Sequence, residues 1–128
     1  MTPSSSITNF DSANLKGANL ERADFLEADL SYATLMGVYA KGINLFMANL
    51  HKVDWREGVL EEADLQGADL SNADFRRAHM QDARMAGADL REANLCGVDL
   101  LDATGLTQEQ VDSAEIDERT RLPAYLRD

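Results

Sequence analysis

Carboxylates are the most frequent chemistry-bearing side chains of this sequence, and many recur at a fixed spacing. Of 128 residues, 23 are acidic, whereas two are histidine (His51 and His79) and one is cysteine (Cys96). Stacked aspartates such as Asp69 and Asp89 could act as paired carboxylates in general acid–base chemistry if the fold brought them into a shared pocket. Whether they meet depends on the elements that carry them.

Those elements are built from a five-residue repeat. A large apolar residue stands at every fifth position from Phe10 to Leu100, in nineteen units that run from Thr8 to Asp102 without a slip of frame. Eighteen of the nineteen central residues are Leu, Phe, Met or Trp, and Ala40 is the exception. Ala stands two residues before the centre in thirteen units, and Asp or Asn stands one residue before it in fourteen. A spacing of five fits neither an α-helix, on which it rotates a side chain by about 140°, nor a flat strand.

The repeat predicts a chain that turns a corner once per unit. Within a unit the small residue and the centre are two apart, so an extended segment points both side chains inward. The next two positions are polar or glycine, as in Lys16-Gly17 and Gln66-Gly67, which suits a turn. The Asp or Asn then points outward beside the corner, where its side chain can bond a nearby backbone amide. Stacked coils of this kind form a narrow solenoid with the centres inside.

The recurring A-(D/N)-(L/F)-x-x pattern, as in residues 63–75 (ADLQGADLSNADF), resembles the pentapeptide-repeat family, which is common in bacteria. The resemblance implies an all-β solenoid, a right-handed quadrilateral β-helix with four units per coil. The 95 repeat residues would then form nearly five coils, a rod of about 23 Å at ordinary strand spacing. We therefore expect a short N-terminal segment (1–7), a pentapeptide-repeat β-helix (8–102), and a C-terminal helix and cap (103–128).

The two ends of this rod differ in sequence. Thr107 and Gln110 form a T-x-x-Q capping box, which predicts a short α-helix from about Gln108 to Ala114. Three residues beyond it could fold back onto the last coil, as in the C-terminal caps of many family members: Leu122, Tyr125 and Leu126. Residues 1–6 offer almost nothing apolar, so we expect the first coil to be poorly capped or covered by a partner.

On a twenty-residue coil the candidate catalytic residues do not converge. His51 and His79 map to different faces, and Cys96 lies outward on a turn without a nearby histidine. Asp69 and Asp89 stack, but as motif residues they are expected to bond turn amides. The sequence has no phosphate-cradling glycine loop and no metal-ligand spacing. We therefore expect no enzyme activity, no catalytic, metal or cofactor-binding residue, and no cofactor.

Trp55 is the bulkiest residue at an inward position of the repeat. The small residues Ala40 and Gly58 lie near it in the coil. This arrangement predicts compensation of volume around a large ring, which we favour over a cofactor role.

Composition and charge limit the partners and the compartment. The formal net charge of −11 disfavours direct binding to nucleic acid and allows a basic protein partner. Cys96 is the single cysteine, so no internal disulfide can form, as in a reducing compartment. Residues 1–10 lack the features of a secretory signal, and no apolar run reaches membrane-spanning length. A cytoplasmic protein without membrane contact is expected.

Exposed apolar residues break the repeat in two places. The outward position loses its Asp or Asn five times, and three of these losses fall in one column: Tyr39, Val59 and His79. At an outward position that we assign to the neighbouring face, a second set stacks: Leu26 and Phe46, with Met47 beside Phe46. Scattered surface residues would give the same pattern, whereas their clustering favours a protein-interaction patch or a homodimer contact.

Charged residues also stack in lines. Column stacking predicts an acidic stripe along one corner of the coil: Glu21, Glu61, Glu62, Asp82 and Asp102. The stripe is either an ordinary solvated corner or a docking line that steers a basic partner.

Three functions remain open on this basis. The leading hypothesis is a rigid, non-catalytic interaction module that binds an unidentified protein, as a monomer or a homodimer. The resemblance implies a second, because some family members bind DNA gyrase (a topoisomerase), mimic duplex DNA in width and charge, and protect against quinolones. A 23 Å rod matches only about 7 base pairs, and motif aspartates supply much of the acidity, so we favour the interaction module. The third hypothesis is a purely structural spacer.

Overall fold

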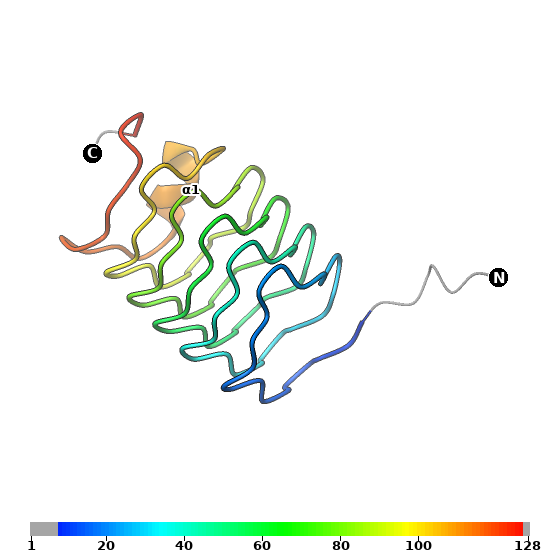
Figure 1. Cartoon of the computed structure of the whole chain (residues 1–128). Coiled ribbons are helices and arrows are strands. Elements are labelled where there is room, and N and C mark those ends of the chain that lie inside the picture. The colour runs from blue at the N-terminus through cyan, green and yellow to red at the C-terminus, as the bar shows by residue number, and fades with distance from the viewer. Residues whose placement is uncertain (1–7, 127–128) are drawn as a thin grey trace.

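The computed structural model describes residues 8–126, and in it the chain winds into a rod of stacked coils (Figure 1). Residues twenty apart lie above one another, and each side of a coil pairs with the next coil through a single parallel β-bridge, as between Asn9 and Asp29. The described residues therefore contain isolated bridges in place of extended strands, together with one helix, α1 (Gln108–Ser113). The predicted solenoid is confirmed in its coarse form, with little continuous strand.

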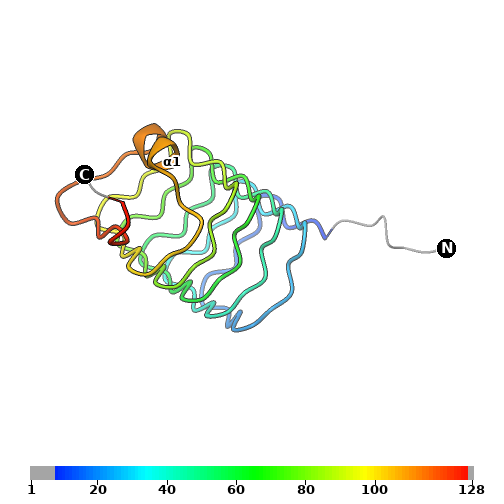
Figure 2. The same ribbon diagram turned by 90° about the horizontal axis from the view of Figure 1, so that it is seen from above.

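Four columns of bridge residues define the four sides of the rod, which we number in chain order. Side 1 begins at Asn9, side 2 at Asn14, side 3 at Asn19 and side 4 at Asp24, and each column repeats every twenty residues. Seen from above in Figure 2, the coils stay in register along the rod. Because of this register, a side chain's place on the surface follows from its number alone.

The corners are β-turns that the repeat dictates. The amide of each small residue donates to the carbonyl of the preceding centre, as from Ala13 N to Phe10 O at 2.8 Å. The second turn residue has a positive φ at all nineteen corners, thirteen of them without glycine, as a type II turn requires. All fourteen motif Asp and Asn side chains accept a hydrogen bond from the amide two residues on, as Asp64 does from Gln66 N at 3.1 Å. The predicted role of the outward position is confirmed.

The inward-facing residues fill the rod. Trp55 is fully buried, its ring stacks on that of Phe75 with centroids 6.2 Å apart, and its Nε1 donates to Val38 O at 3.4 Å. A Cβ on Gly58 would overlap the indole at Cδ1 and Nε1, so the missing side chain of Gly58 leaves room for Trp55. The volume compensation predicted between these two residues is confirmed.

Residues 106–126 lie over the last coil. Helix α1 begins after Thr107, whose capping box with Gln110 is formed, and ends one residue earlier than predicted, at Ser113. The segment donates a hydrogen bond to the last coil on all four sides: Gln110 Nε2 to Ala88 O, Glu115 N to Ala93 O, Arg121 N to Val98 O, and Tyr125 Oη to Ala103 O. Leu122 and Leu126 pack against the core, as predicted. The chain thus adds an irregular further turn beyond the regular repeat.

The first coil has no comparable layer over it among the described residues. Its central residues Phe10, Leu15 and Leu20 are only partly buried, whereas the centres from Leu30 to Leu100 are buried. The core therefore reaches solvent at one end of the described rod.

Candidate interaction surface

Side 3 is where three successive coils carry no Asp or Asn. Tyr39, Val59 and His79 occupy its bridge positions and pair in that order, from one coil to the next. Tyr39 exposes 40% of its surface, His79 is exposed, and Val59 is half-buried between them. We call these three residues the side-3 ladder. Because stacked coils lie about 4.8 Å apart, the ladder forms one continuous strip.

Each residue of the side-3 ladder lacks the side-chain hydrogen bond that a motif Asp or Asn makes to the turn. Its side chains do not accept from the amides of Lys41, Glu61 and Gln81, which stand where the motif provides an Asp or Asn acceptor. A hydrogen bond of this kind contributes about 1 kcal/mol. Cross-strand pairs of aromatic and β-branched residues return a similar amount, so the fold tolerates the exchange. What changes is the surface, which becomes apolar and aromatic over three coils.

Leu26, Phe46 and Met47 lie at the corner between sides 4 and 1, and we call them the corner group. All three are exposed, Met47 to 51%. Side 4 and the corner between sides 3 and 4 separate them from the side-3 ladder. The corner group follows side 4, which adjoins side 3 as predicted, and it lies on the far edge of side 4. That the six residues act as one interaction patch stays a prediction.

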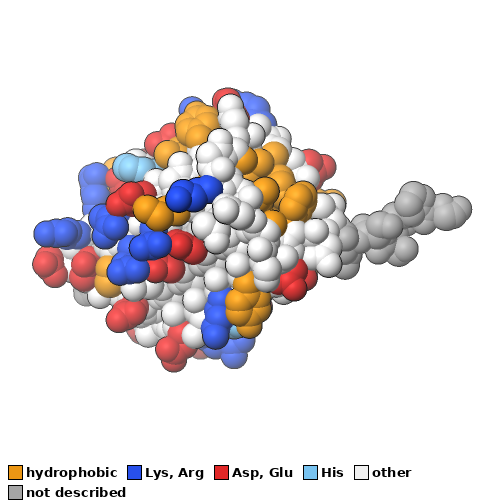
Figure 3. Space-filling model, turned by 90° about the horizontal axis from the view of Figure 1, so that it is seen from below, with side chains coloured by type: hydrophobic (Ala, Val, Ile, Leu, Met, Phe, Trp, Pro, Cys, Tyr) orange, Lys and Arg blue, Asp and Glu red, His pale blue; other side chains and the backbone are white. Residues whose placement is uncertain are grey.

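Hydrophobic and charged side chains are also divided along the rod. On the face shown in Figure 3, hydrophobic side chains gather toward the end where the described chain begins, and charged side chains gather toward the other end.

The predicted acidic stripe runs along the corner between sides 3 and 4. Glu62, Asp82 and Asp102 are exposed there, with Glu61 half-buried beside them. Arg22 and Lys41 occupy the same corner near the start of the rod and separate Glu21 from the other four. Among residues 8–126, no ion pair involves a carboxylate of the stripe.

One buried polar atom lies in the corner next to the side-3 ladder. Gln81 Oε1 is buried and has no hydrogen-bond partner among the described residues. A buried acceptor without a donor is costly.

Arginines pair with motif aspartates on all four sides of the rod. Arg56 Nη2 lies 2.8 Å from Asp54 Oδ2, and Arg91 Nη2 lies 2.6 Å from Asp89 Oδ2. Hydrogen bonding and charge from Arg56 lower the pKa of Asp54, and Arg91 does the same for Asp89. Asp54, Asp74 and Asp89 therefore hold both turns and ion pairs, and Asp69 holds its turn.

His51, Ser71 and Asp69 form a hydrogen-bonded chain that the sequence reasoning missed. His51 Nδ1 lies 2.9 Å from Ser71 Oγ, and Ser71 Oγ donates to Asp69 Oδ1 at 2.6 Å. A hydroxyl has one proton, and here Asp69 receives it, so His51 Nδ1 must donate to the serine and does not act as its base. The spacing of twenty between residues 51 and 71 could have revealed this contact.

Cys96 lies at a corner, as predicted, but is partly buried. Burial, with the nearby Asp117 and Glu115 carboxylates, raises the pKa of the Cys96 thiol, so little thiolate forms near neutral pH.

Residues 8–126 contain neither a metal-binding cluster nor a membrane-spanning helix. No group of histidine, cysteine, aspartate or glutamate side chains within this range is arranged to hold a metal ion. None of its helices is long and apolar enough to cross a membrane.

Sequence comparison identifies the repeat. A family model described as pentapeptide repeat region matches residues 8–78, and a second, pentapeptide repeats in eight copies, matches residues 76–104. No curated protein matches the chain.

Several solved structures share the fold. HetL, a pentapeptide repeat protein involved in heterocyst differentiation regulation from the cyanobacterium Nostoc sp. strain PCC 7120, is 34% identical with a TM-score of 0.75, over 78% of this chain and 42% of HetL. The pentapeptide repeat protein alr5209 from Nostoc PCC 7120 is 29% identical with a TM-score of 0.58, over 89% of this chain and 84% of alr5209.

A trypsin-treated variant of QnrB1, a plasmid-mediated fluoroquinolone resistance protein, aligns with a TM-score of 0.78 over 94% of this chain and 60% of QnrB1. At 22% identity, this likeness shows the fold alone. The chain therefore spans about two fifths of HetL and three fifths of QnrB1.

Proposed function

Because the chain belongs to the pentapeptide-repeat family, we propose that it acts as a rigid, non-catalytic module that binds another protein through the side-3 ladder. The observation that carries this proposal is the replacement of the motif Asp or Asn by Tyr39, Val59 and His79 in three successive coils. Aromatic side chains supply large contact area at low entropic cost and are frequent anchors of protein interfaces.

The surroundings of the side-3 ladder support a protein partner. The acidic stripe lies along the adjoining corner and is free to attract basic side chains at its rim. A partner with an apolar centre and a basic edge fits this surface.

The rod is held rigid by its stacked repeat and also by the segment that covers its last coil. We infer a right-handed quadrilateral β-helix, and we assign residues 106–126 the role of its C-terminal cap, because this segment occupies the carbonyls on all four sides of the last coil. A capped rod presents the side-3 ladder without rearrangement.

DNA mimicry remains the alternative function. The likeness to QnrB1 supports it only through the shared fold. Arginines pair with Asp54 and Asp74 on side 2 and with Asp89 on side 1, which neutralises part of the negative charge that a DNA mimic would present. A purely structural spacer, the third alternative, would bind no partner.

Restoring the repeat gives a test that leaves the fold intact. The triple variant Tyr39→Asn, Val59→Asn and His79→Asn should regain the turn bonds of side 3 and unfold at the same or a higher temperature. It should lose the protein that the wild-type chain retains in affinity capture. Thr34→Asn, which makes the same repair on side 2, is the matched control and should keep the partner.

Three outcomes would count against the proposal. Equal capture by the triple variant and the wild type would remove the side-3 ladder from the interface. Absence of any specific partner would favour the spacer. Inhibition of gyrase supercoiling by both proteins alike would favour DNA mimicry.

A further inference from the structure

The open edge of the first coil has a defined hydrogen-bonding pattern. In the second coil, Asp29 points both its N–H and its C=O toward the first: the N–H donates to Thr8 O at 2.8 Å, and the C=O accepts from Phe10 N at 2.7 Å. By the same register, each bridge residue of the first coil points both groups along the rod axis, away from the rod. These residues are Asn9, Asn14, Asn19 and Asp24. No described residue pairs with their N–H or C=O groups.

This pattern is self-complementary. In an antiparallel pair of the hydrogen-bonded type, two opposing residues exchange both N–H···O=C bonds. A residue that presents both groups on one edge is therefore the partner of another residue that does the same. A parallel strand would need the alternating pattern, which the opposite edge of each coil presents instead.

We propose that a second copy of this chain docks head to head on the first coil, so that the two rods form a two-fold symmetric dimer. Turning one rod end over end reverses the direction of its chain, so all four sides meet their partners antiparallel. Four mutual pairs then form, with eight hydrogen bonds.

The helical pitch fixes which residues meet. The edge of the first coil is a ramp that climbs by one coil spacing between residues 8 and 27. Two such edges, related by a two-fold axis perpendicular to the rods, stay equally far apart on all four sides in one arrangement only. The axis must pass through the corner between sides 4 and 1, where the start and the end of the coil differ in height. Asn9 of each copy then faces Asp24 of the other, and Asn14 faces Asn19 of the other.

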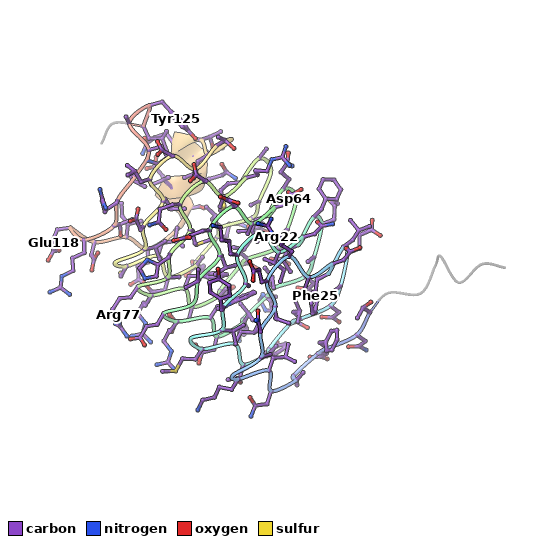
Figure 4. The ribbon with its side chains drawn as sticks, viewed as in Figure 1. Arg22, Phe25, Asp64, Arg77, Glu118 and Tyr125 are labelled. Atoms are coloured by element: carbon purple, nitrogen blue, oxygen red, sulfur yellow. The ribbon has the colours of Figure 1, made fainter. Side chains whose placement is uncertain are left out.

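Side chains at this edge favour the contact. The partly buried centres Phe10, Leu15 and Leu20 would be covered by the second copy, which buries apolar surface that is half-exposed in the single rod. Figure 4 shows Phe25 and Arg22 in this part of the rod. At the corners the opposed charges are mixed, because Asp11 faces the corner of Glu21 and Arg22, so no block of like charge prevents approach.

The other end of the rod explains why assembly would stop at two copies. Residues 106–126 occupy the last coil's carbonyls on all four sides, so a third rod finds no matching edge there. The side-3 ladder stays exposed in this dimer. The dimer and the proposed function are therefore tested separately.

The test uses the freedom of the motif to carry Asp or Asn. Asn14→Asp with Asn19→Asp keeps both turn bonds, since a carboxylate accepts them equally well, but places two carboxylates side by side at each of two pairs across the interface. Like charges directly opposite one another are destabilising, and the dimer dissociation constant should rise about tenfold. High salt should reverse part of the effect.

The matched control is Asn49→Asp with Asn94→Asp, which adds the same charge at motif positions away from the first coil. Sedimentation equilibrium of the full chain should find a dimer for the wild type and the control, and a weaker dimer for the first-coil variant. Hydrogen exchange should show the Asn14 and Asn19 amides protected in the dimer and exposed on dilution.

Each contrary result is decisive. A wild-type chain that stays monomeric at all accessible concentrations overturns the proposal. So does a dimer that both double variants weaken equally. Protection of the first-coil amides in a monomer would mean that the chain covers its own edge, and would also overturn it.

Discussion

At the end of the rod formed by the last coil, residues 106–126 bond the backbone on every side, whereas the first coil leaves the corresponding groups without a described partner. Both ends are coils of the same repeat, and at both the columns of β-bridges between coils come to an end. The difference is that one end is closed by irregular chain with its own helix and turns, and the other keeps the regular edge. A regular edge can be matched by another regular edge, so only the first coil is suited to assembly.

Truncation after Gly105 should have the largest effect on this contrast. It removes the buried side chains of Leu106 and Val111 and strips the donors from the last coil. Buried apolar side chains contribute about 1.5–3 kcal/mol each, so the loss of roughly 5 kcal/mol approaches the whole stability of a small domain. We expect aggregation in size-exclusion chromatography and a much lower unfolding temperature.

Removal of the first coil, residues 8–27, is the comparison for that truncation. The rod already has an open edge at this end, and the deletion only shifts that edge by one coil. Asp29 and Asn44 would then present their N–H and C=O groups in place of those of the first coil. The shortened chain should stay soluble and unfold cooperatively at a moderately lower temperature. Equal aggregation of the two truncations would show that the ends do not differ.

Gly58→Ala should come next, and it tests whether the two ends share one cooperative core. A Cβ at Gly58 overlaps the Trp55 indole, which is fully buried and stacked on Phe75. Overpacking of this kind costs about 1–3 kcal/mol. Amides of the first coil and of residues 106–126 should lose protection together in hydrogen exchange. Adding Trp55→Phe should relieve the overlap, and a double variant no more stable than Gly58→Ala would contradict this account.

The sequence predicts the solenoid, its corners and the Trp55–Gly58 pair because each depends on a local rule repeated at fixed register. The helix at residues 108–113 was also predictable, since Thr107 and Gln110 signal it directly. The repeat did not show how far apart the side-3 ladder and the corner group lie, because residues 46 and 47 follow side 4 and stand at its far edge. The sequence indicated that Tyr125 folds back onto the last coil, but it did not indicate which groups the hydroxyl bonds. Tyr125 lies in an irregular segment, and no repeat fixes its position relative to the coil.

Tyr125→Phe should weaken the closed end without affecting the open one. The Tyr125 hydroxyl donates to Ala103 O at 3.1 Å and accepts from Leu106 N at 3.1 Å, and Figure 4 shows Tyr125 beside α1. Losing both bonds should cost about 1 kcal/mol of unfolding free energy in chemical denaturation. Tyr32→Phe, at an exposed corner near the other end, is the control and should change little. A loss as large in the control would mean that Tyr125 does not hold the end closed.

The smallest expected difference between the two ends is their response to acid, which depends on Asp117 at the closed end. Partial burial raises the pKa of Asp117, but hydrogen bonds from the Gly97 and Arg119 amides and from Thr120 outweigh it and lower the pKa below its usual value. A lowered pKa in the folded state means that the carboxylate stabilises the closed end above about pH 4, and that this contribution is lost as pH falls through the folded pKa.

Hydrogen-exchange protection of the Gly97 amide, corrected for its intrinsic rate, should therefore fall at low pH. The Glu92 amide bonds a backbone carbonyl, Ser113 O, and should change less. Asp117→Asn should remove the pH dependence at Gly97, since the amide oxygen still accepts but does not titrate. Three of the four first-coil bridge residues are asparagines, so the turns at these positions are held by an amide oxygen that does not titrate. If the amides of the first coil lost protection at a higher pH than the Gly97 amide, the carboxylate of Asp117 would not be what makes the closed end sensitive to acid.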